Sequence, residues 1–243
     1  MTTMETLAGV VVSPAKTFDD INRRPSWIIP LLLMLLMNFA ITFVVYRVMV
    51  TPANFDRVAQ TKVQWDAEAS GKTLSPQDAE QQVEVLRRQR DRWYLLPPYA
   101  VLISTLGLSA FFYLVLRLAK AGTTFQKTFS VICWSFVIYR GIGGVVTLIW
   151  LMLRGPAKFM PAPAEAWSPT SLAHLVPRAL VTANQYSAIS KLDIVLVWWL
   201  AVIAIGLART SSNLSFKKAA VVVGISEAVY LILNAMGALP GVT

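Results

Sequence analysis

The feature that most constrains this chain is a series of apolar stretches, each long enough to cross a membrane. Hydrophobic residues make up 56% of the 243 residues, charged residues make up 14%, and the mean hydropathy is +0.56. A transmembrane helix needs about 20 largely apolar residues to cross a hydrocarbon core of about 30 Å. A soluble domain carries roughly a quarter charged residues. We therefore expect an all-α, polytopic membrane protein.

The apolar stretches predict a bundle of five transmembrane helices. Interfacial residues mark the ends of the first one, which begins at Trp27 and has Tyr46 and Arg47 near its other end. Pro97 and Pro98 open the second stretch. The five predicted spans are residues 27–50, 97–118, 128–153, 192–209 and 219–239.

Residues 1–26 precede the first span and predict a short amphipathic helix. Ser13-Pro14 is typical of a helix start, and Pro25 of a helix end. Two interpretations of this lead-in remain open. In the first interpretation the apolar residues, among them Val10, Phe18 and Ile21, lie on the membrane surface. In the second the segment is a solvated helical lead-in.

Residues 51–96 separate the first two spans and predict an extramembrane helical hairpin. Thr51-Pro52 and Ser75-Pro76 are each typical of a helix start, and Ser70-Gly71-Lys72 separates the two helices. The second helix carries acidic residues early and arginines late, which complements the helix dipole. A structural role therefore accounts for its arginines.

Basic residues near the span ends predict the orientation in the membrane. The N-terminal segment and the short turns after the second and fourth spans are basic, whereas the C-terminal tail carries no basic residue. Short basic loops stay in the cytoplasm, so we expect a cytoplasmic N-terminus and an outside C-terminus. The outer side then holds the hairpin and the loop 154–191, in which we expect one short helix near residues 171–180.

Two charged residues, Arg140 and Glu227, lie inside predicted spans. An ion at mid-membrane costs at least about 2.5 kcal/mol, so such a residue suggests a function. At about 1.5 Å per residue the two lie at comparable depths, which predicts an ion pair with Asn38 or Asn234 nearby. The pair either fixes the packing of the bundle or serves transport.

Gly141 and Gly144 lie one turn apart next to Arg140 and predict a close approach of another helix. Enzyme chemistry is not indicated: Cys133 is the single cysteine, His174 is the single histidine, and no phosphate-binding motif is present. We expect no catalytic residue, metal ion or cofactor. The net charge of +9 belongs to residues flanking the spans, which favours contact with the lipid bilayer over binding to nucleic acid.

Three segments together resemble the Yip family, the Rab/Ypt-interacting membrane proteins, in its bacterial form. They are LAGVVVSPAKTFDDINRRPSWIIPLLL, AGTTFQKTFSV and LDIVLVWWLAVIAIGLARTSSNLSFKKAAVVVGI. The resemblance covers most of the chain. It implies five transmembrane helices, a cytoplasmic N-terminus and location in the bacterial inner (plasma) membrane. Eukaryotic members of the family are linked to Rab GTPases through partner binding, but a bacterial cell has no Rab, so the partner is not implied.

We therefore expect a non-catalytic integral membrane protein that organises the membrane or binds protein partners, with the hairpin 51–96 and the N-terminal segment as contact surfaces. Self-association into a homo-oligomer is compatible with this expectation. The alternative is a small transporter or channel subunit that uses Arg140 and Glu227. A transporter predicts a water-accessible cavity that reaches these residues, whereas an adaptor predicts a dry interface.

Overall fold

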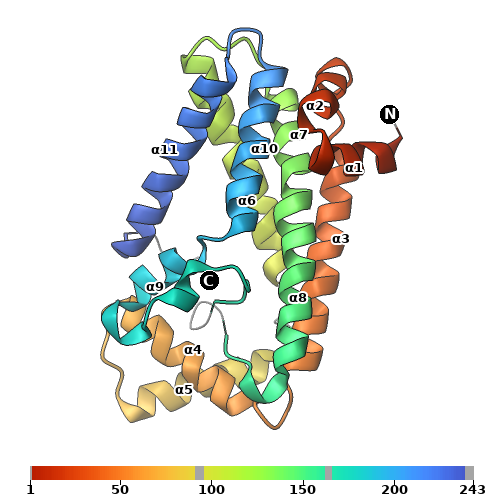
Figure 1. Cartoon of the computed structure of the whole chain (residues 1–243). Helices are drawn as coiled ribbons and strands as arrows, with labels where there is room; N and C mark the ends of the chain where they lie inside the picture. The colour runs from red at the N-terminus through yellow and green to blue at the C-terminus, as the bar shows by residue number, and fades with distance from the viewer. Residues whose placement is uncertain (1, 91–95, 162–165, 239–243) are drawn as a thin grey trace. The chain divides into compact units, whose positions relative to one another are not determined.

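Long apolar helices dominate the structure, a computed structural model that describes residues 2–90, 96–161 and 166–238 (Figure 1). Within these ranges every regular element is helical. Among the described residues, three helices are long and apolar enough to cross a membrane, namely Ile28–Met49, Tyr99–Leu118 and Phe125–Arg154. Ala183–Ser190 and Ile194–Thr210 add a fourth if they form one broken span.

Helix boundaries follow most of the sequence signals, although the helix predicted to start at Thr51-Pro52 begins at Phe55, after Asn54. The α-helices are α1 (Thr3–Val12), α2 (Pro14–Arg23), α3 (Ile28–Val44), α4 (Phe55–Ala69), α5 (Pro76–Gln89), α6 (Leu96–Leu118), α7 (Phe125–Phe136), α8 (Gly143–Arg154), α9 (Ala183–Ser190), α10 (Ile194–Thr210) and α11 (Phe216–Ala235). Two π-helical segments continue apolar helices, η1 (Val45–Met49) after α3 and η3 (Val137–Ile142) between α7 and α8.

Helices of spanning length therefore lie where the sequence predicts the first three spans. The predicted fifth span overlaps α11, which carries Lys217, Lys218 and Glu227 and is not among the helices that qualify. Residue 239, at the end of that predicted span, lies outside the described residues. The number of five spans stays a prediction.

The chain divides into two compact units. The first contains residues 1–39, 97–144 and 195–227, and the second contains residues 40–96, 145–194 and 228–243. Because the boundaries fall at several points along the chain, each unit is assembled from segments far apart in sequence.

The first unit is built around α7, in which every residue from Thr128 to Phe136 is buried. A helix that is apolar on all sides is suited to a position inside a bundle. Its serines cost little, because Ser130 and Ser135 donate hydrogen bonds to the carbonyl oxygens four residues earlier, at 2.8 and 2.7 Å.

Helix α10 approaches α7 closely at Gly206. A Cβ atom at this position would lie 2.5 Å from Cγ1 of Val131 and 3.1 Å from the ring of Phe18. The absence of a side chain at Gly206 therefore lets α2, α7 and α10 meet.

Part of the apolar face of the lead-in packs against protein, whereas Met4 is 74% exposed, so both interpretations of this segment stay predictions. Val10, Phe18 and Ile21 are buried inside the first unit, and α2 packs against α7. The segment forms two helices, Thr3–Val12 and Pro14–Arg23, and the sequence analysis missed the first of them, α1. The signal was present, because Thr2 and Glu5 form a capping box, with bonds of 2.7 and 3.2 Å.

In the second unit, α4 and α5 pack against each other around Val58, Val63 and Val83. Leu151 and Phe159, from much later in the chain, belong to the same buried cluster. A second cluster places Trp65 of α4 against Ala183 and Tyr186 of α9.

The helix expected near residues 171–180 is wrong. Two short 3-10 turns, Leu172–Leu175 and Arg178–Leu180, occupy that segment, and the α-helix is α9. Pro177 lacks the amide hydrogen and prevents an α-helix from continuing through this stretch. The start of α9 is set by Thr182 and Gln185, which form a capping box.

Candidate functional site

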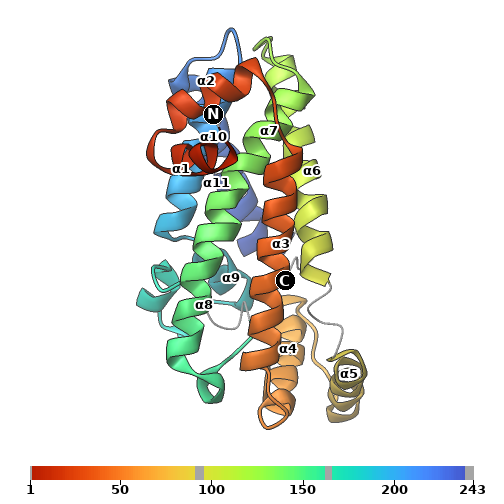
Figure 2. The same ribbon diagram turned by 90° about the vertical axis from the view of Figure 1, so that its right-hand side faces the viewer.

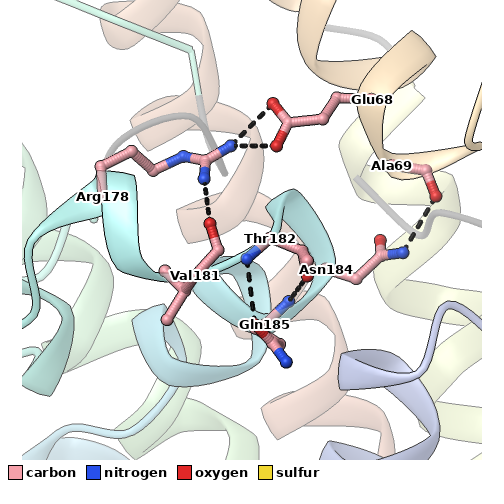
Figure 3. Close-up of polar contacts among 7 residues, drawn as sticks. All are labelled: Glu68, Ala69, Arg178, Val181, Thr182, Asn184 and Gln185. Atoms are coloured by element: carbon pink, nitrogen blue, oxygen red, sulfur yellow. Dashed lines mark hydrogen bonds and ion pairs between the residues drawn. The ribbon is translucent and has the colours of Figure 1, made fainter.

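The most elaborate polar arrangement in the second unit surrounds Arg178 (Figure 3). One guanidinium nitrogen, Nη2, lies 2.7 Å from each carboxylate oxygen of Glu68 in α4. The other, Nη1, donates a hydrogen bond of 2.6 Å to the carbonyl oxygen of Val181. A single side chain thus joins α4 to the backbone that leads into α9.

Aromatic rings lie beneath the same guanidinium group. Its Cζ atom is 4.7 Å from the ring centre of Trp65 and 5.6 Å from that of Tyr186. The two rings are 5.9 Å apart at an interplanar angle of 69°. A planar guanidinium stacks on such rings and binds a carboxylate, a combination that an ammonium group does not match. We call Trp65, Glu68, Arg178 and Tyr186 the arginine clamp.

Asn184 adds a second connection between α9 and α4, since its Nδ2 donates to the carbonyl oxygen of Ala69 at 2.9 Å (Figure 3). Gly237, after α11, lies against it: a Cβ there would be 2.5 Å from Nδ2 of Asn184. Gly237 also has a φ of +70°, which favours glycine. The clamp therefore lies where the ends of three helices meet.

A shallow groove of about 460 Å³ runs between α4 and α5. Apolar side chains contribute to its walls, and two acidic residues lie among them. It is lined by Val63, Asp66, Leu74, Asp78, Gln81, Gln82, Val85 and Leu86. Val85 is 51% exposed, so it contributes apolar surface that is accessible from the groove.

Charge pairs fix the helices on both sides of this groove. Arg87 of α5 reaches Asp56 of α4 at 2.9 Å and Glu84 at 2.6 Å, and Arg88 lies 3.2 Å from Glu84. The hydrogen bonds from Arg88 and Arg87 lower the pKa of Glu84 below its usual value, and the bond to Asp56 raises the pKa of Arg87. These arginines of the run therefore act within the hairpin.

In the first unit, Arg140 lies in the π-helical segment η3. Its Cζ atom is 5.4 Å from the ring centre of Tyr139, which in turn stacks on Trp199 of α10 at 4.8 Å. The Nε atom of Arg140 is buried and has no hydrogen-bond partner among the described residues. π-Helical turns occur frequently at functional sites, so Arg140 stays a candidate functional residue.

The three predicted partners of Arg140 do not all belong to the same unit of the chain. Asn38 and Glu227 belong to the first unit and Asn234 to the second. The side-chain oxygens of Asn38 and Asn234 are buried without a hydrogen-bond partner in the described part of the chain. The ion pair between Arg140 and Glu227 stays a prediction.

Gly141 lies against α3. A Cβ atom there would be 3.0 Å from Cε of Met37. Gly143 similarly lies against α10, with a distance of 3.0 Å to Cγ1 of Val195. A packing role for Gly144 stays a prediction.

The sequence analysis missed two signals at these sites. The clamp residue Arg178 lies in a segment that reads as an ordinary loop, although the capping pair Thr182 and Gln185 marks the helix behind it. The second signal is a repeat: Phe-Val-Val-Tyr-Arg at residues 43–47 and Phe-Val-Ile-Tyr-Arg at residues 136–140. Both copies reach into a π-helical segment.

The site carries none of the arrangements that hold a metal ion: within the described ranges there is no suitable group of three His, Cys, Asp or Glu residues. Helices of spanning length, together with polar groups that connect helices, define an integral membrane protein in which every regular element of the described residues is helical.

The chain belongs to the Yip1 domain family, whose model matches residues 8–237. This is a family of membrane proteins, and it confirms the resemblance to the Yip family. The comparison with curated proteins and the comparison with solved structures each gave no significant match.

Proposed function

We propose that this protein is a non-catalytic scaffold of the membrane that binds a protein partner on α4 and α5. The observation that carries the proposal is the groove between these helices. It combines exposed apolar surface at Val85 with the carboxylates of Asp66 and Asp78. Such a lining is suited to a helix or peptide that carries apolar and basic side chains.

Contacts that connect α4 and α5 to each other and to α9 support this function. The arginine clamp joins α4 to α9, and Arg87 joins α5 to α4. A surface that is ordered before binding loses less conformational entropy when the partner binds.

The test is a photo-cross-linking amino acid placed at Val85 in the full-length protein in its native membrane. We expect a discrete cross-linked product, identified by mass spectrometry. Glu80 is the matched control, since it is exposed on the same helix but does not line the groove. A product from Glu80 but not from Val85 would place the binding surface elsewhere, and no product from either would contradict the proposal.

We propose the predicted orientation together with this function: a cytoplasmic N-terminus, an outside C-terminus and the bacterial inner membrane as location. The short basic turns after α6 and α10 support it. A phosphatase fused after Thr243 should be active, because it folds only outside the cytoplasm. An inactive phosphatase at this position, with an active fluorescent reporter in its place, would reverse the orientation.

A transporter or channel subunit is the second candidate. It is favoured by the buried Nε of Arg140, whose missing hydrogen bond in the described residues would be supplied by a bound anion or by water. Flux of a small anion into proteoliposomes, abolished in Arg140→Ala, would support this candidate. Equal flux in wild type, Arg140→Ala and empty liposomes would exclude this candidate and leave the scaffold as the proposed function.

A further inference from the structure

The turn between α6 and α7 and the turn between α10 and α11 are held together as one surface. The backbone amides of Asn213 and Ser212 donate to the carbonyl oxygens of Ala121 and Gly122, at 3.1 and 3.4 Å. The hydroxyl of Thr123 donates to the carbonyl oxygen of Thr210 at 3.4 Å. Both turns lie at the same end of the first unit (Figures 1 and 2).

Gly122 makes this contact possible. Its φ of +66° favours glycine, and a Cβ atom there would overlap the hydroxyl oxygen of Ser212. The two turns therefore meet backbone to backbone, and their outward side chains belong to a common surface.

The helices that follow the two turns begin in the same way. Thr124 accepts a hydrogen bond from the amide of Lys127 at 3.3 Å, and Ser215 accepts one from the amide of Lys218 at 3.4 Å. The next residue is a phenylalanine in both cases: Phe125 is 39% exposed and Phe216 is 52% exposed. Each turn thus presents an exposed aromatic ring close to a lysine.

Positive charge accumulates on this surface without matching carboxylates. Among the described residues, no acidic side chain forms an ion pair with any of five cations that flank the turns, whereas Arg209 contacts Asp19 at 3.5 Å. The five cations are Arg117, Lys120, Lys127, Lys217 and Lys218. We call these five cations, with Phe125 and Phe216, the basic tip.

Lys120 has an unusual backbone conformation, with a φ of +52°. It ends α6 in the left-handed conformation, and the amide of Ala121 donates to the carbonyl oxygen of Leu116 at 2.9 Å. Glycine is normally found at this position, because a Cβ atom is unfavourable there. The chain therefore keeps a cation where glycine would give a more stable turn.

We propose that the basic tip binds the headgroups of anionic phospholipids. The tip follows the ends of the apolar helices α6 and α10, at the level where headgroups meet these helices. Exposed phenylalanines next to lysines suit a membrane interface, where the ring enters the acyl region and the ammonium group meets phosphate. The 84% exposed Leu118, at the end of the apolar helix α6, suits contact with acyl chains rather than with nucleic acid.

The test uses the full-length protein in mild detergent, titrated with phosphatidylglycerol or phosphatidylcholine, with bound lipids counted by native mass spectrometry. Wild type should bind phosphatidylglycerol more tightly, and salt should weaken the preference. A lysine near a headgroup contributes about fivefold in affinity, so Lys120→Gln, Lys217→Gln and Lys218→Gln together should lower it at least about tenfold. Binding of phosphatidylcholine should not change.

Two further variants keep the result interpretable. Lys72→Gln removes an exposed lysine from the turn between α4 and α5, and it should leave the lipid preference unchanged. Lys120→Gly removes one cation and also the unfavourable backbone conformation, so it should raise the melting temperature while weakening phosphatidylglycerol binding about fivefold. The proposal is overturned if wild type binds both lipids equally, if the triple variant keeps the preference, or if Lys72→Gln loses it.

Discussion

Arg178 contacts both carboxylate oxygens of Glu68 at 2.7 Å while its guanidinium lies over the ring of Trp65 at 4.7 Å. The ion pair is partly exposed, with 36% of the arginine side chain and 51% of the glutamate side chain accessible, so charge alone contributes at most about 1 kcal/mol. Stacking on the ring adds about 0.5–1 kcal/mol. The clamp therefore depends on shape as much as on charge.

Arg178→Ala should destabilise the connection between α4 and α9 by about 1–2 kcal/mol, because it removes the ion pair, the stacking and the bond to Val181. Amide hydrogen exchange in residues 178–190 should become faster. Arg178→Lys keeps the charge but not the planar group, so it should recover less than half of the protection. If the lysine variant were as protected from exchange as the wild type, a positive charge alone would be sufficient to hold α4 and α9 together.

Gly206→Ala should destabilise the protein by about 1–3 kcal/mol, since the new Cβ would lie 2.5 Å from Val131. Gly224→Ala is the matched control: it also lies within a helix, and nothing lies within 4 Å of its would-be Cβ. It should stabilise the helix by up to about 1 kcal/mol. Thermal unfolding in detergent measures both. Equal melting temperatures would contradict the close approach of α2, α7 and α10.

The predicted ion pair of Arg140 and Glu227 can be tested by a double-mutant cycle. If the two side chains pair, Glu227→Ala should cost up to about 3 kcal/mol, because it leaves the half-buried Arg140 without its counterion. Arg140→Ala combined with Glu227→Ala should then be less damaging than the sum of the single changes. Additive effects on the free energy of unfolding would show that the residues do not interact.

The pKa of Glu84 predicts a pH dependence for the stability of α5, the helix that also carries its two arginine partners. Hydrogen bonds from Arg88 and Arg87 lower this pKa below its ordinary value of 4.5. A group whose pKa is lowered by folding stabilises the folded state above its ordinary pKa, and this contribution is lost as the pH falls through the lowered value. Carboxyl carbon NMR of the full-length protein should therefore give a midpoint below 4.5. In Arg88→Gln the midpoint should rise, and an unchanged midpoint would contradict the assignment.

Elements set by local signals were predictable. The Ser-Pro pairs at Ser13 and Ser75 mark the starts of α2 and α5, and the long apolar stretches mark helices of spanning length. These features depend on residues a few positions apart, so the sequence contains them directly. Arg140 also lies near the middle of the helix Phe125–Arg154, as its position in the apolar stretch predicts.

Features set by distant residues were not predictable in the same way. Whether Phe18 meets lipid or protein depends on Gly206, which is far along the chain. The arginine clamp depends on a partner in α4, and no pattern around Arg178 identifies Glu68. The groove likewise exists only because α4 and α5 pack against each other.

The sequence by itself determined that this is a helical membrane protein, because hydrophobicity over about 20 residues is a local property that the bilayer selects. It also determined family membership, since the Yip1 domain pattern extends over residues 8–237. Only the tertiary structure decided which polar groups meet: Arg178 with Glu68, and the turn at Gly122 with the turn at Ser212. Pairing across many residues depends on the packing of whole helices, and packing is a property of the folded chain.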